Sequence, residues 1–168
     1  LRELEQASLA FEKPDADKSP HYTRWLAMLL APGGSLGGAR PKASVIDEKQ
    51  RLWIAKFPSK NDEYDIGAWE MLLNNLAKRV GITTAPSQIK KLNSQHHTFL
   101  SQRFDRSNKG SRVHFASAMT LLQRTDGDDA SQGASYLELA EFIMRQGAEP
   151  TRDLEQLWRR IVFYICVS

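Results

Sequence analysis

Four glycines lie within six positions of this chain, at residues 33, 34, 37 and 38, directly before a predicted strand. Glycine has no Cβ and adopts positive φ without steric cost, so a glycine-rich segment can wrap its backbone N–H groups around a phosphate. The spacing is neither that of a Walker A loop nor the G-x-G-x-x-G of dinucleotide-binding folds and ordinary protein kinases. The stretch is therefore either an unusual phosphate-binding loop or a plain glycine-rich turn.

A lysine lies inside the predicted strand from Leu52 to Phe57, among otherwise apolar residues. Because an unpaired ammonium group is costly to remove from water, Lys56 needs an anionic partner. In kinases, such a strand lysine binds nucleotide phosphates and pairs with a glutamate of the following helix. Glu70, in the next predicted helix, is the candidate partner. The alternative is an edge-strand lysine whose stem covers apolar surface, with Glu70 as an ordinary surface charge.

A third group, Gln102-Arg103-Phe104-Asp105-Arg106, lies at the end of another predicted strand and before a glycine-containing turn. Alternating arginine and aspartate around an aromatic residue is typical of a salt-bridged strand end. The same position, after the second pair of strands, is where kinase-like folds place the hinge whose backbone holds adenine. The residues alone leave both interpretations open.

The elements that must hold these residues are predicted from the spacing of apolar side chains. Helices are predicted at residues 1–12, 21–30, 66–80, 117–123, 136–145 and 152–167, and strands at 43–46, 52–57, 87–92, 98–104 and 112–115. Residues 13–20 are predicted to be a linker, and the hydroxyl of Thr151 to cap the last helix. This order predicts an α+β fold, with a small antiparallel sheet and one interposed helix followed by a helical region. That is the layout of a protein-kinase-like amino lobe.

Length and composition fit one globular domain or one lobe of a larger protein. The chain has 168 residues, a net charge of +3 and 41% hydrophobic residues. No apolar run reaches the ~18 residues that span a bilayer and no signal peptide is evident, so we expect no membrane partner. Acidic and basic residues are interspersed, which does not require a nucleic-acid partner. The single cysteine, Cys166, fits a reducing cytoplasm, and its apolar neighbours predict that it fills the core.

Four segments, in this order, resemble HipA-type serine/threonine kinases. They are Ser-Leu-Gly-Gly-Ala-Arg-Pro-Lys (35–42), Trp-Ile-Ala-Lys-Phe-Pro (53–58), Glu70 with Leu-Ala-x-x-x-Gly-Ile (76–82), and Arg-Phe-Asp-Arg (103–106). Two later segments, Ser135-Tyr136-x-x-Leu139 and Leu157-x-x-Arg160-x-Val162-Phe163, resemble the carboxy-terminal lobe of that family. Each segment is unspecific alone, and the resemblance rests on their order over nearly the whole chain.

HipA-type proteins are kinase-like toxins of bacterial toxin–antitoxin pairs. The resemblance implies transfer of phosphate from ATP, with Mg²⁺, to a serine or threonine of a protein substrate in the bacterial cytoplasm. A small DNA-binding antitoxin is the implied partner, without direct contact to nucleic acid. It further implies a kinase-like amino lobe with two leading helices over residues 1–116, and the start of a helical carboxy lobe over residues 117–168.

The resemblance also implies roles for individual residues. Lys56 matches the lysine that contacts the ATP phosphates, and Glu70 matches its ion-pair partner by helix position. Ser35 matches the loop serine that the family can autophosphorylate. The residues implied to bind the nucleotide, with the last two at the hinge that meets adenine, are Ser35, Gly37, Gly38, Ala39, Lys42, Lys56, Gln102 and Phe104.

The sequence departs from the family pattern at its end. Family members carry an Asp-x-His-x-x-Asn catalytic loop after the apolar run that matches residues 161–167, followed by a metal-binding aspartate, whereas this sequence stops at Ser168. We therefore expect a fragment, which also fits the start at Leu1 rather than at a methionine. We expect it to hold no catalytic or metal-ligating residue and to have no kinase turnover by itself. Two other classes stay open: a non-catalytic kinase-like module that binds a partner or antitoxin, and a nucleic-acid-binding domain.

Overall fold

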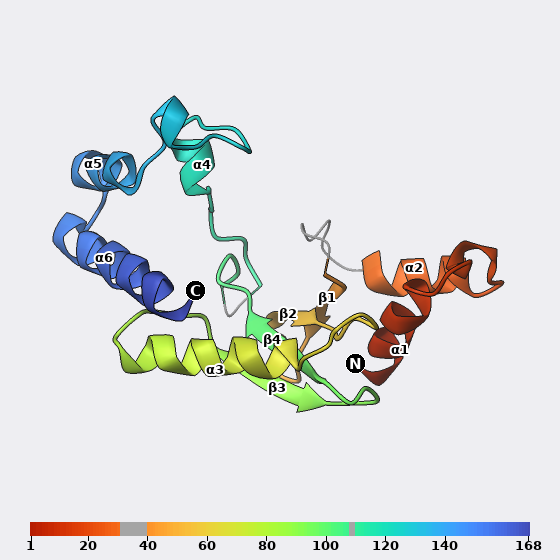
Figure 1. Ribbon diagram of the computed structural model, residues 1–168. Helices are drawn as coiled ribbons and strands as arrows, with labels where there is room; N and C mark the ends of the chain where they lie inside the picture. The colour runs from red at the N-terminus through yellow and green to blue at the C-terminus, as the bar shows by residue number, and fades with distance from the viewer. Residues whose placement is uncertain (31–39, 108–109) are drawn as a thin grey trace. The chain divides into compact units, whose positions relative to one another are not determined.

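The computed structural model describes residues 1–30, 40–107 and 110–168, and Figure 1 shows the arrangement of their helices and strands. The elements, in chain order, are α1 (Arg2–Phe11), η1 (Ala16–Lys18), α2 (Tyr22–Leu30), β1 (Lys42–Ile46), β2 (Leu52–Lys56), α3 (Ile66–Arg79), β3 (Ser87–Lys91), β4 (His97–Gln102), α4 (Ala118–Leu121), η2 (Ala130–Gln132), α5 (Tyr136–Gln146) and α6 (Pro150–Val167). The four strands form one antiparallel sheet in the order β1-β2-β4-β3. The predicted α+β fold with a small antiparallel sheet is confirmed.

The described chain forms two compact units. Unit 1 comprises Leu1–Leu76 and Thr84–Val113, and unit 2 comprises Ala77–Thr83 and His114–Ser168. The sheet, α1, α2 and most of α3 belong to unit 1, while α4, α5 and α6 belong to unit 2. The predicted boundary between two kinase lobes after residue 116 stays a prediction.

Strand register divides the sheet of unit 1 into two chemically different faces. Directly opposed residues share a face, and Lys42 opposes Lys56, which opposes Phe99. The neighbouring register row, Ala43, Ala55 and Leu100, therefore points to the other face. One face thus carries Lys42, Lys56 and Phe99, and the other carries the small and apolar side chains of the core.

The apolar face of the sheet forms the main hydrophobic core of unit 1. Its buried members are Ala43, Trp53, Ala55, Phe57 and Leu100, and Leu1, Leu4, Leu29 and Val45 pack against them. Leu1 adjoins α1, while Leu4 and Leu29 lie on α1 and α2, so the first thirty residues cover this face. Phe57 is fully buried, and burial of such a side chain contributes about 1.5–3 kcal/mol.

A buried carboxylate fixes α1 to the sheet. Glu5 Oε1 accepts a hydrogen bond from Thr98 Oγ1 at 3.0 Å, and Glu5 Oε2 accepts from the backbone N–H groups of Asn93 at 2.7 Å and Ser94 at 3.2 Å. Glu5 therefore provides the acceptor for two backbone N–H groups in the turn between β3 and β4. A buried charge is tolerated when it receives several hydrogen bonds of this kind.

Helix α3 begins at a cap that also contacts β4. Asp65 Oδ1 accepts hydrogen bonds from the N–H of Ala68, in the first turn of α3, and from the N–H of His97, both at 3.0 Å. Two residues after the cap, a Cβ added to Gly67 would lie 2.1 Å from the carbonyl oxygen of His97. Only glycine allows the helix to approach the strand this closely.

Unit 2 contains a helix that contacts the backbone around Gly81, which has a φ of 78°. From α6, Arg159 donates to the carbonyl of Val80 at 3.0 Å, and Gln156 donates to the carbonyl of Gly81 at 2.9 Å. Gln156 also accepts from the N–H of Thr83 at 2.9 Å. These side chains satisfy backbone groups beyond the end of α3, where helical hydrogen bonds run out.

Most predicted elements are present, with shifts of one to two residues, but four details were wrong. Residues 112–115 do not form a strand: Arg112 makes an isolated bridge with Arg106, and Val113 donates its N–H to the carbonyl of Asp105. The linker at residues 13–20 contains η1. Helix α6 begins at Pro150, with Glu149 as the N-cap and Thr151 inside the helix, because proline is pre-organised for the first helical position. Cys166 is exposed and not a core residue.

The apolar side chains that recur at helical spacing along α3 are only partly buried. Trp69 and Leu72 are 56% and 44% exposed, whereas Ala77 is buried. The contacts of α3 with the sheet come from Gly67, which approaches His97, and from Glu70, which pairs with Lys56. Within the described ranges, no helix has the length and apolar character needed to cross a membrane.

Candidate functional site

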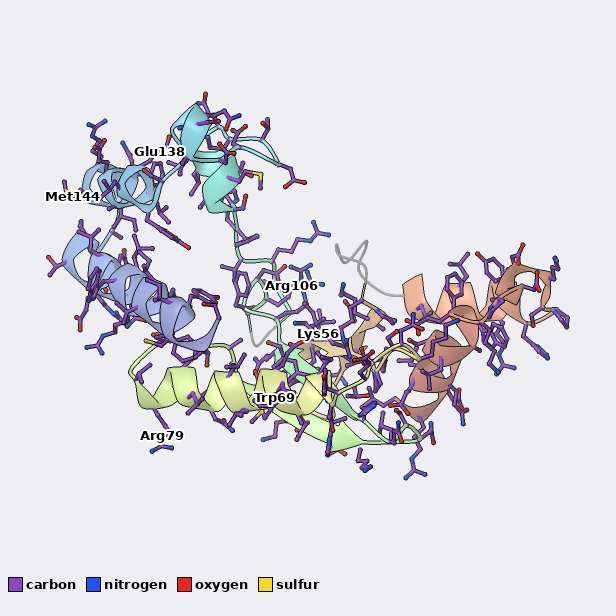
Figure 2. The ribbon with its side chains drawn as sticks, viewed as in Figure 1. Lys56, Trp69, Arg79, Arg106, Glu138 and Met144 are labelled. Carbon is purple, nitrogen blue, oxygen red and sulfur yellow. The ribbon has the colours of Figure 1, made fainter. Side chains whose placement is uncertain are left out.

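Lys56, at the end of β2, forms an ion pair with Glu70 on α3. Lys56 Nζ donates to Glu70 Oε2 at 2.6 Å, and the same ammonium lies 5.5 Å from the centroid of the Phe99 ring. The two charged side chains are 34% and 26% exposed, so the pair is accessible to solvent from one side. Figure 2 labels Lys56 together with Trp69, which precedes Glu70 on α3. The structure brings together the strand lysine and helix glutamate that were singled out from the sequence.

Lys42 lies beside Lys56, because the two residues are opposed at the same end of the β1–β2 hairpin. Partial burial, together with the positive charges of Lys56 and Arg40, lowers the pKa of Lys42, while Glu70 acts in the opposite direction. Two ammonium groups on one face of a sheet repel each other, and an anion between them relieves that repulsion. This end of the hairpin is therefore electrostatically suited to a phosphate.

A third cation near this end, Arg40, was not singled out from the sequence. Its guanidinium donates two hydrogen bonds to Asp62, at 3.0 and 2.6 Å. Burial would raise the pKa of Asp62, but the hydrogen bonds from Arg40 and from the Ser59 N–H hold it below its ordinary value. No local sequence pattern indicated this pair, since its members are separated by 22 positions.

The predicted hinge, Gln102 to Phe104, lies at the end of β4. The N–H of Gln102 donates to the carbonyl of Pro86, and the N–H of Arg103 donates to the carbonyl of Leu52, both at 2.9 Å. The N–H groups of Gln102 and Arg103 are thus engaged by neighbouring main-chain carbonyls. The Phe104 side chain is 66% exposed.

The arginines around the hinge share one carboxylate. Arg103 contacts both oxygens of Asp105, at 2.9 and 2.7 Å, and Arg106 donates to Asp105 Oδ2 at 2.6 Å. Hydrogen bonds from Arg103, together with the charges of both arginines, lower the pKa of Asp105 to about 2 despite partial burial. Arg103 also reaches Ser44 on β1 at 3.4 Å. The salt-bridged strand end, one of the two interpretations of this segment, is therefore present.

Four of the predicted nucleotide-binding residues lie outside the described residues. They are Ser35, Gly37, Gly38 and Ala39. The described part of the site comprises Lys42, Lys56, Glu70 and the segment from Gln102 to Phe104.

The described side chains are suited to binding an anion. Over the ranges that the structure covers, no group of three or more His, Cys, Asp or Glu residues is arranged to hold a metal ion. Lys42 and Lys56 supply the positive charge, Glu70 orients Lys56, and Phe99 lies beneath its ammonium group. Such an arrangement can bind and orient a phosphate without itself carrying out a reaction.

A protein-family model described as the HipA-like C-terminal domain matches residues 34–168. The chain belongs to this family. The resemblance to HipA-type proteins inferred from the sequence is thereby confirmed. No curated protein matches the chain.

The HipA-like C-terminal domain match includes all of the candidate site. It begins at residue 34, so α1 and α2 lie outside it. Even so, Glu5 of α1 is fully buried against the sheet, and Leu4 packs against the core. The fold around the HipA-like site is therefore completed by residues that the family model does not cover.

Proposed function

We propose that this chain is the nucleotide-binding portion of a HipA-type serine/threonine kinase, and that Lys56 and Lys42 bind the phosphates of ATP. The observation that carries the proposal is the ion pair between Lys56 and Glu70 beside Lys42, in a chain that belongs to the HipA-like family. A strand lysine oriented by a helix glutamate is the arrangement with which kinase-like folds hold nucleotide phosphates.

In this proposal the other predicted residues complete the nucleotide site. Backbone groups of residues 35–39 wrap the phosphates, and Ser35 is the candidate for autophosphorylation. The segment from Gln102 to Phe104 holds the adenine through its backbone groups, and the exposed Phe104 ring offers an apolar surface beside it. Mg²⁺ would neutralise phosphate charge, but the described residues do not form a site for it, so the role of this chain is to bind the nucleotide.

The wider role follows from the family. We propose that the complete kinase phosphorylates a serine or threonine of a cytoplasmic protein and is held by a small DNA-binding antitoxin. Residues 1–168 contain no Asp-x-His-x-x-Asn segment, so by themselves they should bind ATP without turnover. We propose no direct contact with nucleic acid.

Isothermal titration calorimetry with ATP and Mg²⁺ tests the proposal. We expect saturable binding by the wild-type chain and about 10–100-fold weaker binding by Lys56→Ala, since a hydrogen bond to a charged group contributes about 1.5–3 kcal/mol. Glu70→Gln keeps the lysine and removes its orienting charge, so we expect a smaller loss of several-fold.

Lys90→Ala is the matched control, because Lys90 is an exposed lysine on β3 whose register position places it on the opposite face of the same sheet. It should bind ATP as the wild type does. If the folded wild-type chain shows no saturable binding, the proposed nucleotide site is wrong. The non-catalytic interaction module would then be the better interpretation.

A further inference from the structure

Arg40 and Asp62 form an ion pair near the end of the β1–β2 hairpin that carries Lys42 and Lys56, and among the described residues it is less exposed than the pair of Lys56 and Glu70. The two nitrogens Nη1 and Nη2 of Arg40 contact the two carboxylate oxygens of Asp62 at 3.0 and 2.6 Å. The Asp62 side chain is only 9% exposed, and that of Arg40 is 22% exposed, compared with 34% for Lys56. A two-point contact of this kind fixes orientation as well as distance.

The pair connects two segments that flank the lysines. Arg40 lies two residues before Lys42, and the N–H of Phe57 donates to the carbonyl of Pro41 at 2.9 Å. Asp62 lies in the turn after β2, where its Oδ2 also accepts from the N–H of Ser59 at 2.9 Å. The contact therefore joins the residue that leads into Lys42 to the turn that follows Lys56.

The turn itself is held by Glu12, the residue that follows α1 as its C-cap. Glu12 Oε2 accepts hydrogen bonds from Ser59 Oγ at 2.9 Å and from the Lys60 N–H at 2.8 Å. Asp62 thus lies in a turn that is held by hydrogen bonds, and Arg40 reaches it from the segment that precedes β1. This contact lies just beyond the opposed pair of Lys42 and Lys56, at the same end of the hairpin as the hydrogen bond from the Phe57 N–H to the Pro41 carbonyl.

We propose that Arg40 is a positioning residue, which through Asp62 holds Lys42 beside Lys56 so that both amines contact one polyphosphate. The inference rests on the proposed ATP site and names the residue that sets its two-lysine geometry. Two neighbouring ammonium groups repel each other, and the contact between Arg40 and Asp62 opposes their separation together with the hydrogen bond from the Phe57 N–H to the Pro41 carbonyl. The lowered pKa of Lys42, caused by burial and by the charges of Lys56 and Arg40, agrees with such enforced proximity.

A double-mutant cycle on ATP affinity, measured by calorimetry with Mg²⁺, separates positioning from direct binding. We expect Lys42→Ala and Arg40→Ala each to weaken binding by about tenfold, and the double variant to bind no more weakly than Lys42→Ala alone, because Arg40 acts through Lys42. Arg40→Lys keeps the charge but not the two-point contact and should weaken binding nearly as much. Asp62→Asn should do the same.

A second measurement, made without nucleotide, tests whether the contact between Arg40 and Asp62 keeps Lys42 beside Lys56. The pKa of Lys42 is followed by NMR of the lysine Cε signals in ¹³C-lysine-labelled protein, assigned with Lys42→Arg. In Asp62→Asn, loss of an anion would by itself lower the pKa of Lys42 further. If Lys42 instead moves away from Lys56, its pKa rises toward the ordinary value of 10.5. We expect the rise.

Arg51→Ala is the matched control, because Arg51 and Asp47 form an ion pair at 2.7 Å at the opposite end of the same hairpin. It should change neither ATP affinity nor the Lys42 titration. Circular dichroism and thermal unfolding select the variants that remain folded, and Arg40→Lys serves if Arg40→Ala does not fold. If Arg40→Ala binds ATP as the wild type does while Lys42→Ala binds weakly, the inference is overturned and the ATP site stands. If the wild type binds no ATP, the proposed site fails together with the phosphate contact of the inference, and the Lys42 titration then decides only whether the contact between Arg40 and Asp62 positions Lys42.

Discussion

Glu5 and Thr98 form a hydrogen bond of 3.0 Å between α1 and β4, and both side chains are fully buried. Neither residue carries a pattern that would mark it in the sequence, and Glu5 lies before the start of the family match at residue 34. The contact nevertheless links the first helix to the central part of the sheet. It makes the integrity of unit 1 dependent on a segment outside the recognised family region.

Replacing Glu5 should therefore destabilise the protein. In Glu5→Gln, one side-chain oxygen becomes an NH₂ group and the negative charge is lost. The NH₂ group either faces the N–H groups of Asn93 and Ser94, which then lose their acceptor, or faces Thr98, whose hydroxyl must turn to accept and loses the acceptor for its own proton. We expect the free energy of unfolding to fall by about 2–4 kcal/mol, as for other broken buried networks. Urea unfolding followed by circular dichroism measures it. Glu3→Gln, at an exposed glutamate of the same helix, should change it little, and an equal loss in both variants would contradict the assignment.

The close approach of α3 to β4 predicts that Gly67→Ala is harmful even though alanine favours helices. The added Cβ would lie 2.1 Å from the His97 carbonyl oxygen, a backbone atom that cannot move without shifting β4. We expect a loss of about 1–3 kcal/mol in the free energy of unfolding, as for other overpacked sites. Asn75→Ala, at an exposed position of the same helix, should be neutral or stabilising. A stabilised Gly67→Ala variant would show that the helix does not sit this close to the strand.

The lowered pKa of Asp105 predicts that part of the free energy of unfolding is lost at acid pH. A carboxyl group whose pKa is lower in the folded state stabilises the fold above its ordinary pKa, and that contribution disappears as the pH falls through the folded-state value. For Asp105 this window runs from the ordinary 3.8 down to about 2. We expect Asp105→Asn to lower the free energy of unfolding by roughly 1 kcal/mol near neutral pH, with the difference from the wild type vanishing toward the acid end.

Urea titrations at several pH values measure this difference directly. Asp17→Asn, at an exposed aspartate in η1, is the control and should follow the wild-type profile. A constant difference between Asp105→Asn and the wild type across the acid range would mean that the ion pairs with Arg103 and Arg106 do not couple to folding.

Elements with a strong local pattern were predictable from the sequence. In β1 and β2, small or apolar residues that face the core alternate with residues on the face that carries Lys56. In α3, apolar residues repeat at helical spacing. The pair of Lys56 and Glu70 was also predictable from the sequence, because a charged residue among apolar neighbours requires a partner and the next helix offers one. Local signals of this kind depend only on residues close in the chain.

The features that the sequence did not reveal depend on contacts between distant segments. Arg40 and Asp62 are 22 positions apart, and Glu5 and Thr98 are 93 positions apart, so neither pair leaves a local signature. Residues 112–115 have the composition of a strand, but beyond Arg112 the chain finds no partner strand in the described structure, and Phe115 is 59% exposed. Strand formation needs a neighbour, which composition cannot supply.

The contacts of α6 with residues 80–83 have a consequence for how this part of the molecule can vary. Gln156, Arg159 and Arg160 all contact backbone atoms of that segment, and Arg160 reaches the Thr83 carbonyl at 2.6 Å. These side chains of α6 thus bind main-chain atoms of residues 80–83, and the bonds do not depend on which side chains that segment carries. Apart from Gly81 and the buried Ile82, the segment can exchange its residues through evolution without weakening these contacts, whereas its three partners on α6 cannot be exchanged so freely.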